Sequence, residues 1–67
     1  MNRFNTMLKG EIGSRVKWVQ RRLGIAQSGW FDAALESALR AFQDNKGLVL
    51  SGVVGLQTFA HLCWLTL

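Results

Sequence analysis

Residue types that commonly catalyse reactions or bind metals are scarce in this chain. Its one histidine, His61, and its one cysteine, Cys63, are two positions apart in a segment with helical periodicity. Side chains at i and i+2 of a helix lie on different faces, so the imidazole cannot serve as a base for the thiol. Only four Asp and Glu residues accompany them, at spacings unlike those of metal ligands. We therefore expect no catalytic site, no metal site and no cofactor.

Two of the acidic residues, Asp32 and Glu36, fall at the start of a predicted helix. A pair of carboxyl groups is what a glycosidase uses as acid and nucleophile. The alternative is structural, with Asp32 capping the helix and Glu36 stabilising the positive end of its dipole. We favour the structural interpretation and predict that this chain is not itself an enzyme.

Basic residues dominate the first third of the sequence. The net charge is +4, and six of the eight Lys and Arg residues lie in the first 22 positions: Arg3, Lys9, Arg15, Lys17, Arg21 and Arg22. This asymmetry suits nucleic acid, anionic lipid or a cell-wall polymer, or it is simply a solvated face. A nucleic-acid recognition helix usually follows a packed first helix, whereas here the basic helix comes first. Nucleic acid is therefore the weaker alternative.

Tryptophans are the other candidates for ligand contacts. Trp18 lies off the apolar stripe of its predicted helix, three and four positions before Arg21 and Arg22. It either packs beneath the N-terminal segment, stacks with Arg22, or offers an exposed aromatic contact. The chain ends in the apolar stretch HLCWLTL. Trp64 and the residues after it must therefore pack on the N-terminal segment, on a partner or on a following domain.

Length and composition indicate one small globular domain. The chain has 67 residues, 49% of them apolar, and no proline. The lone cysteine cannot form an internal disulfide. No apolar run is long enough to span a bilayer, and the first 13 residues lack the apolar core of a secretory signal. We expect a protein made in the cytoplasm, or a piece of a longer chain.

A repeat of 23 residues organises the middle of the sequence. Five positions recur at this interval: Gln20 and Gln43, Gly24 and Gly47, Ser28 and Ser51, Gly29 and Gly52, Phe31 and Val54. Each unit reads as a helix that ends in Gln, a Gly just beyond it, a short loop, Ser-Gly and an apolar residue. Two copies are too few for a solenoid, so we predict a compact domain with internal pseudo-symmetry.

Apolar periodicity and capping residues predict three helices. The first spans about 15–23, with Ser14 as its N-cap and Gly24 as its left-handed stop. The second spans about 33–45 and the third about 56–65. The prediction is an all-α fold, a compact three-helix bundle with two pseudo-repeated Ser-Gly turns.

This bundle is expected to occupy residues 14–67, preceded by an irregular N-terminal arm, residues 1–13. Phe4, Met7 and Leu8 of the arm can pack back onto the bundle. A short β-bridge between the two equivalent loops is compatible with the pattern.

Three side chains of the repeat have predicted roles in the interior. Gln20 and Gln43 are expected to be buried amides that hold the turns, because a buried amide needs partners at both ends. Phe31 is expected to fill the core.

The stretch VKWVQRRLG, followed by SGWFDAALESALRAFQDNKGLVLSGVVGLQTFAHL, resembles the peptidoglycan-binding domain found at the ends of many bacterial and bacteriophage cell-wall hydrolases. That family's pattern is roughly V-x-x-L-Q-x-x-L-G, then D-G-x-F-G-x-x-T-x-x-A-V-x-x-F-Q, then G-L-x-x-D-G-x-V-G-x-x-T-x-x-x-L. The matching positions are Val16, Val19, Gln20, Leu23, Gly24, Gly29, Phe31, Ala38, Leu39, Phe42, Gln43, Gly47, Leu48, Gly52, Val54, Gly55, Thr58 and Leu62. The resemblance covers positions 13 to 62, and its spacing holds across all three predicted helices and both turns.

The sequence departs from that pattern in four places. Ser28 and Ser51 stand where Asp is usual, Asp32 replaces a glycine, and Leu35 replaces a threonine. Serine makes similar turn hydrogen bonds, so the turns should survive. Most matching residues look like fold determinants, so the resemblance indicates the fold more directly than the ligand contacts.

The resemblance implies non-covalent binding of bacterial peptidoglycan, through its glycan or its stem peptide. Such binding would tether an attached catalytic domain, as in a phage endolysin, to its insoluble substrate. It would place the protein at the cell wall or periplasm, after release from the host cytoplasm or as part of a longer chain. The alternatives are a small basic nucleic-acid-binding protein and an interaction module that docks through its apolar C-terminus.

Ligand contacts are predicted at exposed aromatics, which suit sugars, and at arginines, which suit stem-peptide carboxylates. Trp30 ranks first, because it occupies a variable turn position beside Phe31. The full set is Trp30, Trp18, Trp64, Arg21, Arg22 and Arg40.

Overall fold

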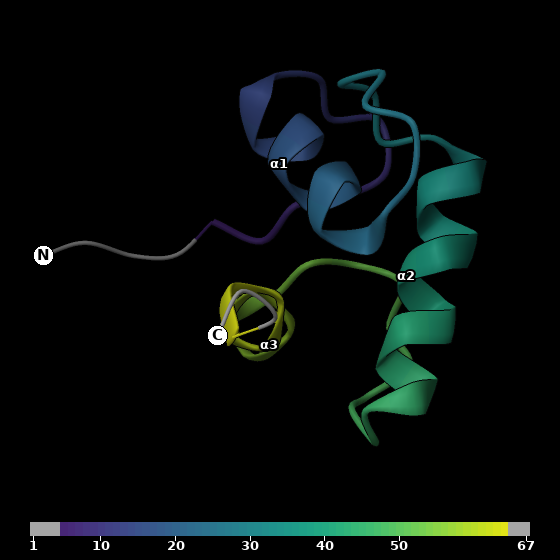
Figure 1. Cartoon of the computed structure of the whole chain (residues 1–67), viewed down its shortest axis with the longest axis vertical. Coiled ribbons are helices and arrows are strands. Elements are labelled where there is room, and N and C mark those ends of the chain that lie inside the picture. Colours follow the sequence, from purple (N-terminus) through teal and green to yellow (C-terminus); the bar gives the residue numbers. More distant parts are fainter. Residues whose placement is uncertain (1–4, 65–67) are drawn as a thin grey trace, which may run out of the picture.

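Across residues 5–64, three α-helices form the framework of the protein, as predicted. The computed structural model describes residues 5–64. Helix α1 spans Ser14–Leu23, α2 spans Ala33–Asn45 and α3 spans Leu56–Trp64, and α1 packs against both of the others (Figure 1). Between residues 5 and 64 the structure has no β-strand, and no helix there is long and apolar enough to cross a membrane.

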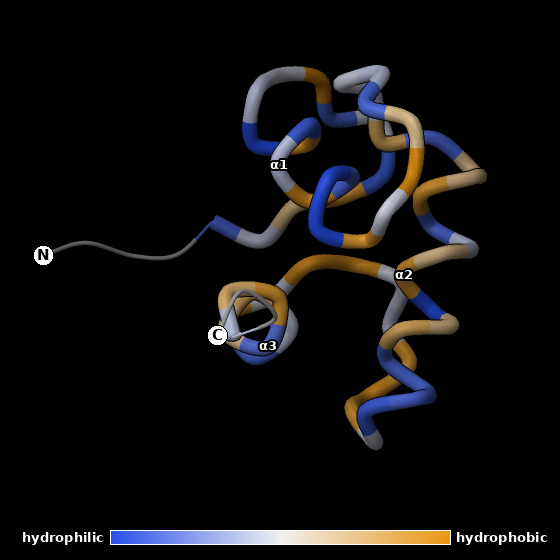
Figure 2. Tube along the Cα trace, in the orientation of Figure 1, coloured by the Kyte–Doolittle hydropathy of each residue, from blue (hydrophilic) through white to orange (hydrophobic). Residues whose placement is uncertain are grey.

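The core draws on every part of this framework. Apolar and polar positions alternate along α1 and α2, and the apolar ones supply much of the interior (Figure 2). Phe31 is fully buried, which confirms its predicted role, and its counterpart in the repeat, Val54, is buried with it. The buried apolar side chains of residues 5–64 are Met7, Val16, Val19, Phe31, Leu35, Leu39, Val54 and Leu62.

Helix α1 begins one residue earlier than predicted. Ser14 is its first residue and Gly13 is its N-cap, without a side-chain hydrogen bond, so the prediction of Ser14 as N-cap is wrong. Gly13 has φ of 145°, a conformation that glycine adopts without strain. Its N–H donates to the carbonyl of Gly29 at 2.9 Å, and its own carbonyl accepts from the N–H of Lys17 at 3.3 Å. The start of α1 is therefore fixed by pairing with the first Ser-Gly turn.

The other helix boundaries follow the predicted capping chemistry. Asp32 caps α2, because its carboxylate accepts a hydrogen bond from the N–H of Leu35 at 3.0 Å. Gly24 ends α1 with φ of 75°, and Gly47 follows α2 with φ of 70°.

The N-terminal arm forms a β-bridge with each of the two equivalent loops. The bridge considered between the two loops themselves is not among the bridges of residues 5–64. Isolated antiparallel bridges join Met7 to Val54 and Ile12 to Trp30. Met7 and Val54 exchange two backbone hydrogen bonds of 3.0 Å each. Of the arm residues expected to pack inward, Met7 does so, Leu8 is 55% exposed, and Phe4 lies outside the described residues.

Phe31 pairs with the arm much as its counterpart Val54 does. The Phe31 N–H donates to the carbonyl of Glu11, and its carbonyl accepts from the N–H of Gly10, both at 2.8 Å. The arm thus binds the same position of both repeat units and holds the two turns relative to each other.

Candidate functional site

The first Ser-Gly turn is built around the amide of Gln20. Its Oε1 accepts from the N–H of Gly29 at 2.9 Å, while its Nε2 donates to Ser28 Oγ at 3.0 Å and to the Trp30 carbonyl at 3.2 Å. Ser28 Oγ also accepts from the Trp30 N–H at 3.2 Å. The backbone of Trp30 is therefore held at both its N–H and its carbonyl.

The second turn repeats this network around Gln43. Its Oε1 accepts from the N–H of Gly52 at 3.0 Å, and its Nε2 lies 3.3 Å from Ser51 Oγ and 3.0 Å from the Val53 carbonyl. Thr58 of α3 adds a further contact, 3.1 Å from Nε2. Both glutamines are buried, which confirms their predicted role as turn-holding amides.

A cationic side chain covers the glycine of each turn. A Cβ atom built on Gly29 would lie 3.1 Å from Lys17 Cε, and one built on Gly52 would lie 3.0 Å from Arg40 Nε. Lys17 and Arg40 are related by the 23-residue repeat, a signal in the sequence that the predictions above did not use. Arg40, a predicted ligand contact, thus belongs to the second turn.

Trp30 presents an aromatic surface on this rigid support. Trp30 is 53% exposed, and Ile12, its partner in the backbone bridge, is 77% exposed. The hydrogen bonds fix the backbone from which the indole projects, so the turn need not be reordered when a ligand binds. This placement is compatible with the predicted contact role of Trp30.

Trp18 is partly buried between α1 and α3. The Arg22 guanidinium lies over its ring, 5.2 Å from the centroid, and the ring of Phe59 is 5.0 Å away at 35°. Of the interpretations left open for Trp18, the structure supports stacking with Arg22. A groove of about 560 Å³ runs beside it, lined by Met7, Ser14, Arg15, Trp18 and Phe59.

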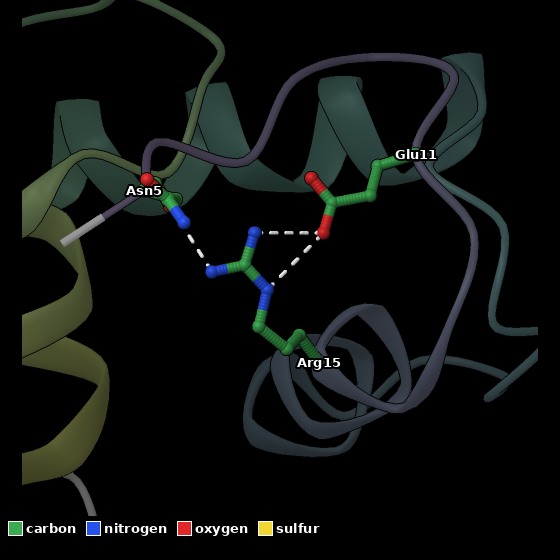
Figure 3. A network of polar contacts seen from close by, with 3 residues as sticks. All are labelled: Asn5, Glu11 and Arg15. Carbon is green, nitrogen blue, oxygen red and sulfur yellow. Dashed lines mark hydrogen bonds and ion pairs between the residues drawn. The ribbon is translucent and has the colours of Figure 1, made fainter.

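Arg15, at the edge of that groove, is already engaged. Its guanidinium bonds to Glu11 Oε2 through Nη2 at 2.8 Å and Nε at 3.2 Å, and Nη1 donates to the Asn5 carbonyl at 3.2 Å (Figure 3). These bonds tie the arm to α1 and leave Arg15 a structural role.

The remaining predicted contacts are dispersed. Arg21 is exposed near the end of α1, and Trp64, 71% exposed on α3, stacks on His61 with ring centroids 6.4 Å apart. Among the six predicted residues, the structure brings Trp18 and Arg22 into direct contact. The apolar residues after Trp64 lie outside the described residues.

The side chains that were weighed as catalytic groups, Asp32, Glu36 and His61, each have a contact within the protein. Asp32 caps α2, which confirms its structural interpretation, and Glu36 lies 3.6 Å from Lys9 Nζ. His61 Nδ1 is 3.0 Å from the carbonyl of Gln57. Within residues 5–64, no group of three or more His, Cys, Asp or Glu side chains is placed to hold a metal ion.

Comparison with known proteins places both turns within one family. No match was found to a curated protein or to a solved structure. A family model described as "Putative peptidoglycan binding domain" matches residues 12–62, which include α1, α2, both Ser-Gly turns and most of α3. The chain therefore belongs to the peptidoglycan-binding domain family, whose members act at the bacterial cell wall.

Proposed function

We propose that this chain is the wall-binding module of a cell-wall hydrolase of the phage endolysin type. Family membership across residues 12–62 carries the proposal. Binding to an insoluble polymer keeps an attached catalytic domain at high local concentration, so a weak module still raises the rate of hydrolysis. Catalysis would belong to that other domain, because the described residues of this chain supply a binding scaffold.

Trp30 is the leading ligand contact in this proposal. Trp30 is 53% exposed on a turn that Gln20 and Ser28 hold in place, so its indole can stack on the apolar face of a sugar ring. Trp18 and Trp64 would extend the aromatic contacts. Arg21, Arg22 and Arg40 would bind stem-peptide carboxylates.

Co-sedimentation with purified insoluble peptidoglycan tests the contact role of Trp30. We expect Trp30→Ala to reduce the bound fraction severalfold while circular dichroism stays unchanged. Leu56→Ala is the matched control, because Leu56 is a 65% exposed apolar residue outside the predicted contacts. Equal binding by the two variants would remove Trp30 from the site.

An interaction module is the second candidate function. Leu56 and Trp64 of α3 are 65% and 71% exposed, which leaves apolar surface for a protein partner. This candidate predicts self-association of the isolated chain in light scattering. A clean monomer that binds peptidoglycan would count against it.

A further inference from the structure

A second cleft separates the end of α1 from the C-terminal half of α2. It has a volume of about 380 Å³, enough for one or two amino-acid residues of a ligand. Its lining residues are Arg22, Leu23, Ala38, Ala41, Phe42, Asn45 and Lys46.

The polar lining of this cleft is cationic and lacks a protein counter-charge. Within residues 5–64, the ion pairs found engage Lys9 and Arg15, and neither Arg22 nor Lys46 has a carboxylate partner. Asp44, next to the cleft in sequence, is not among the lining residues. An anion from outside the chain would therefore meet two positive groups and no acidic one.

Arg22 also has an unmet hydrogen-bonding requirement. Its Nε is buried and has no acceptor in the part of the chain that the structure describes. Buried donors without acceptors are uncommon in proteins, because the lost hydration is not replaced. The Arg22 guanidinium carbon lies over the Trp18 ring, 5.2 Å from its centroid, and Arg22 is also one of the residues that line the cleft.

The rest of the lining is small or apolar, with one amide. Ala38 and Ala41 leave space on the α2 side, while Leu23 and Phe42 offer apolar contacts. Asn45 can both donate to and accept from a peptide backbone. These groups suit a short peptide with methyl side chains better than they suit a hydrated sugar.

We propose that this cleft binds the free C-terminal carboxylate of an alanine-ended stem peptide of peptidoglycan. Arg22 and Lys46 would bind the carboxylate, Asn45 the adjoining peptide group, and the alanyl methyl groups would lie against Ala38 and Phe42. The inference rests on the proposed function and gives it a ligand class and a location.

Two other cations near the start of α1, Arg15 and Lys17, are less suited to this role. Arg15 is paired with Glu11 and also donates to the Asn5 carbonyl, and Lys17 lies along the glycine of the first turn. Arg22 with Lys46 combines a cleft, two positive charges and an unpartnered donor.

An NMR titration of the full ¹⁵N-labelled chain tests the cleft. The probes are N-acetyl-D-alanyl-D-alanine, its C-terminal amide and inorganic phosphate. We expect the free acid to shift amide resonances at the end of α1 and in the C-terminal half of α2. The amide form should bind about tenfold more weakly, which corresponds to the loss of one charge-assisted hydrogen bond.

Two variants separate a specific contact from general attraction. Lys46→Gln changes an exposed residue just beyond α2 and should weaken binding of the free acid by about tenfold. Lys17→Gln removes the same charge outside the cleft and should change the affinity less than twofold. Equal effects of the two variants, or equal shifts with the amide or with phosphate, would overturn the assignment.

Sedimentation with whole peptidoglycan distinguishes this inference from the proposed function. If the unmodified chain sediments with peptidoglycan but the dipeptide causes no shifts, the cleft assignment fails and the wall-binding function stands. If the chain neither sediments nor responds to the dipeptide, both fail.

Discussion

Two buried glutamine amides determine the geometry of the turns. Each joins a helix to the Ser-Gly turn that follows it, through a bond from the glycine N–H and bonds to the serine hydroxyl and a carbonyl. Gln43 also contacts Thr58 and so links α2 to α3. A residue of another shape would leave several of these polar groups without partners.

Replacing Gln43 should therefore destabilise the fold substantially. We expect Gln43→Ala to lower the free energy of unfolding by about 2–4 kcal/mol, because the Gly52 N–H and Thr58 hydroxyl lose their partner. Urea denaturation followed by circular dichroism measures the change. Gln27→Ala, at an exposed loop position, should stay within about 0.5 kcal/mol. Similar losses in both variants would argue against the turn network.

The Asp32 cap makes a smaller, local contribution. Asp32→Ala removes the acceptor for the Leu35 N–H, so we expect a loss of about 1 kcal/mol in the same denaturation experiment. Asp32→Asn retains an acceptor and should recover most of the loss. If Asp32→Asn lost as much unfolding free energy as Asp32→Ala, the stabilisation would come from the negative charge and not from the capping hydrogen bond.

The roles of individual residues could be predicted from the sequence where they depend on neighbouring positions in the chain. The roles of Gln20, Gln43, Phe31 and Asp32 follow from residue type and spacing alone. Ser14 was mispredicted, because a serine before a helix normally caps it. Here tertiary pairing of Gly13 with Gly29 sets the helix start instead.

Among the structural elements, the arm is the part that the sequence described least well. Helix bounds could be predicted to within about one residue, because periodicity and glycine stops mark them. The bridges from the arm to both loops could not, since an isolated bridge depends on which segments meet in three dimensions. The arm has no strand-like alternation that would reveal its partners.

Met7 tests the importance of the arm for the whole fold. It is 1% exposed in the core, so Met7→Ala should cost about 2–4 kcal/mol of unfolding free energy. Leu8→Ala, at a 55% exposed neighbouring position, should change it by less than about 0.5 kcal/mol. Thermal and urea unfolding of both variants provide the comparison. A tolerant Met7 would mean that the helices are stable without the arm.

The turns require glycine at one position and tolerate change at another. Gly52 has φ of 74° and lies beneath Arg40, so Gly52→Ala should destabilise by about 1 kcal/mol or more. Gly55 has no positive φ, and a Cβ atom added to it would meet nothing within 4 Å, so Gly55→Ala is the matched control. Gly55 directly precedes α3 and its carbonyl accepts from the Phe59 N–H at 2.9 Å, a cap position at which glycine is preferred to alanine. We therefore expect a loss of about 0.5 kcal/mol or less in urea denaturation, smaller than that of Gly52→Ala. A larger loss of unfolding free energy in Gly55→Ala than in Gly52→Ala would contradict the described turn.

For the molecule as a whole, pseudo-symmetry and charge determine what surface is offered to a ligand. The repeat places a cation over each turn, and the arm connects the turns. From residue type alone we predicted ligand contacts at six positions: Trp18, Trp30, Trp64, Arg21, Arg22 and Arg40. The sequence could not show that they are dispersed, since their relative positions depend on how the helices pack.

Nonspecific attraction is the main competing explanation for wall binding by a chain with net charge +4. Contacts between exposed charges weaken at high salt, because the screening length falls to about 3 Å at 1 M. Aromatic stacking and buried hydrogen bonds are much less sensitive. The salt dependence of binding therefore distinguishes specific contacts from nonspecific electrostatic attraction.

The most direct measurement is co-sedimentation of the 67-residue chain with insoluble peptidoglycan at low salt and at about 1 M salt. A specific wall-binding module should retain most of its binding at high salt and lose it in Trp30→Ala. Binding that disappears in salt would contradict a contact through the Trp30 indole, and no binding at either concentration would contradict the central claim that this chain recognises peptidoglycan.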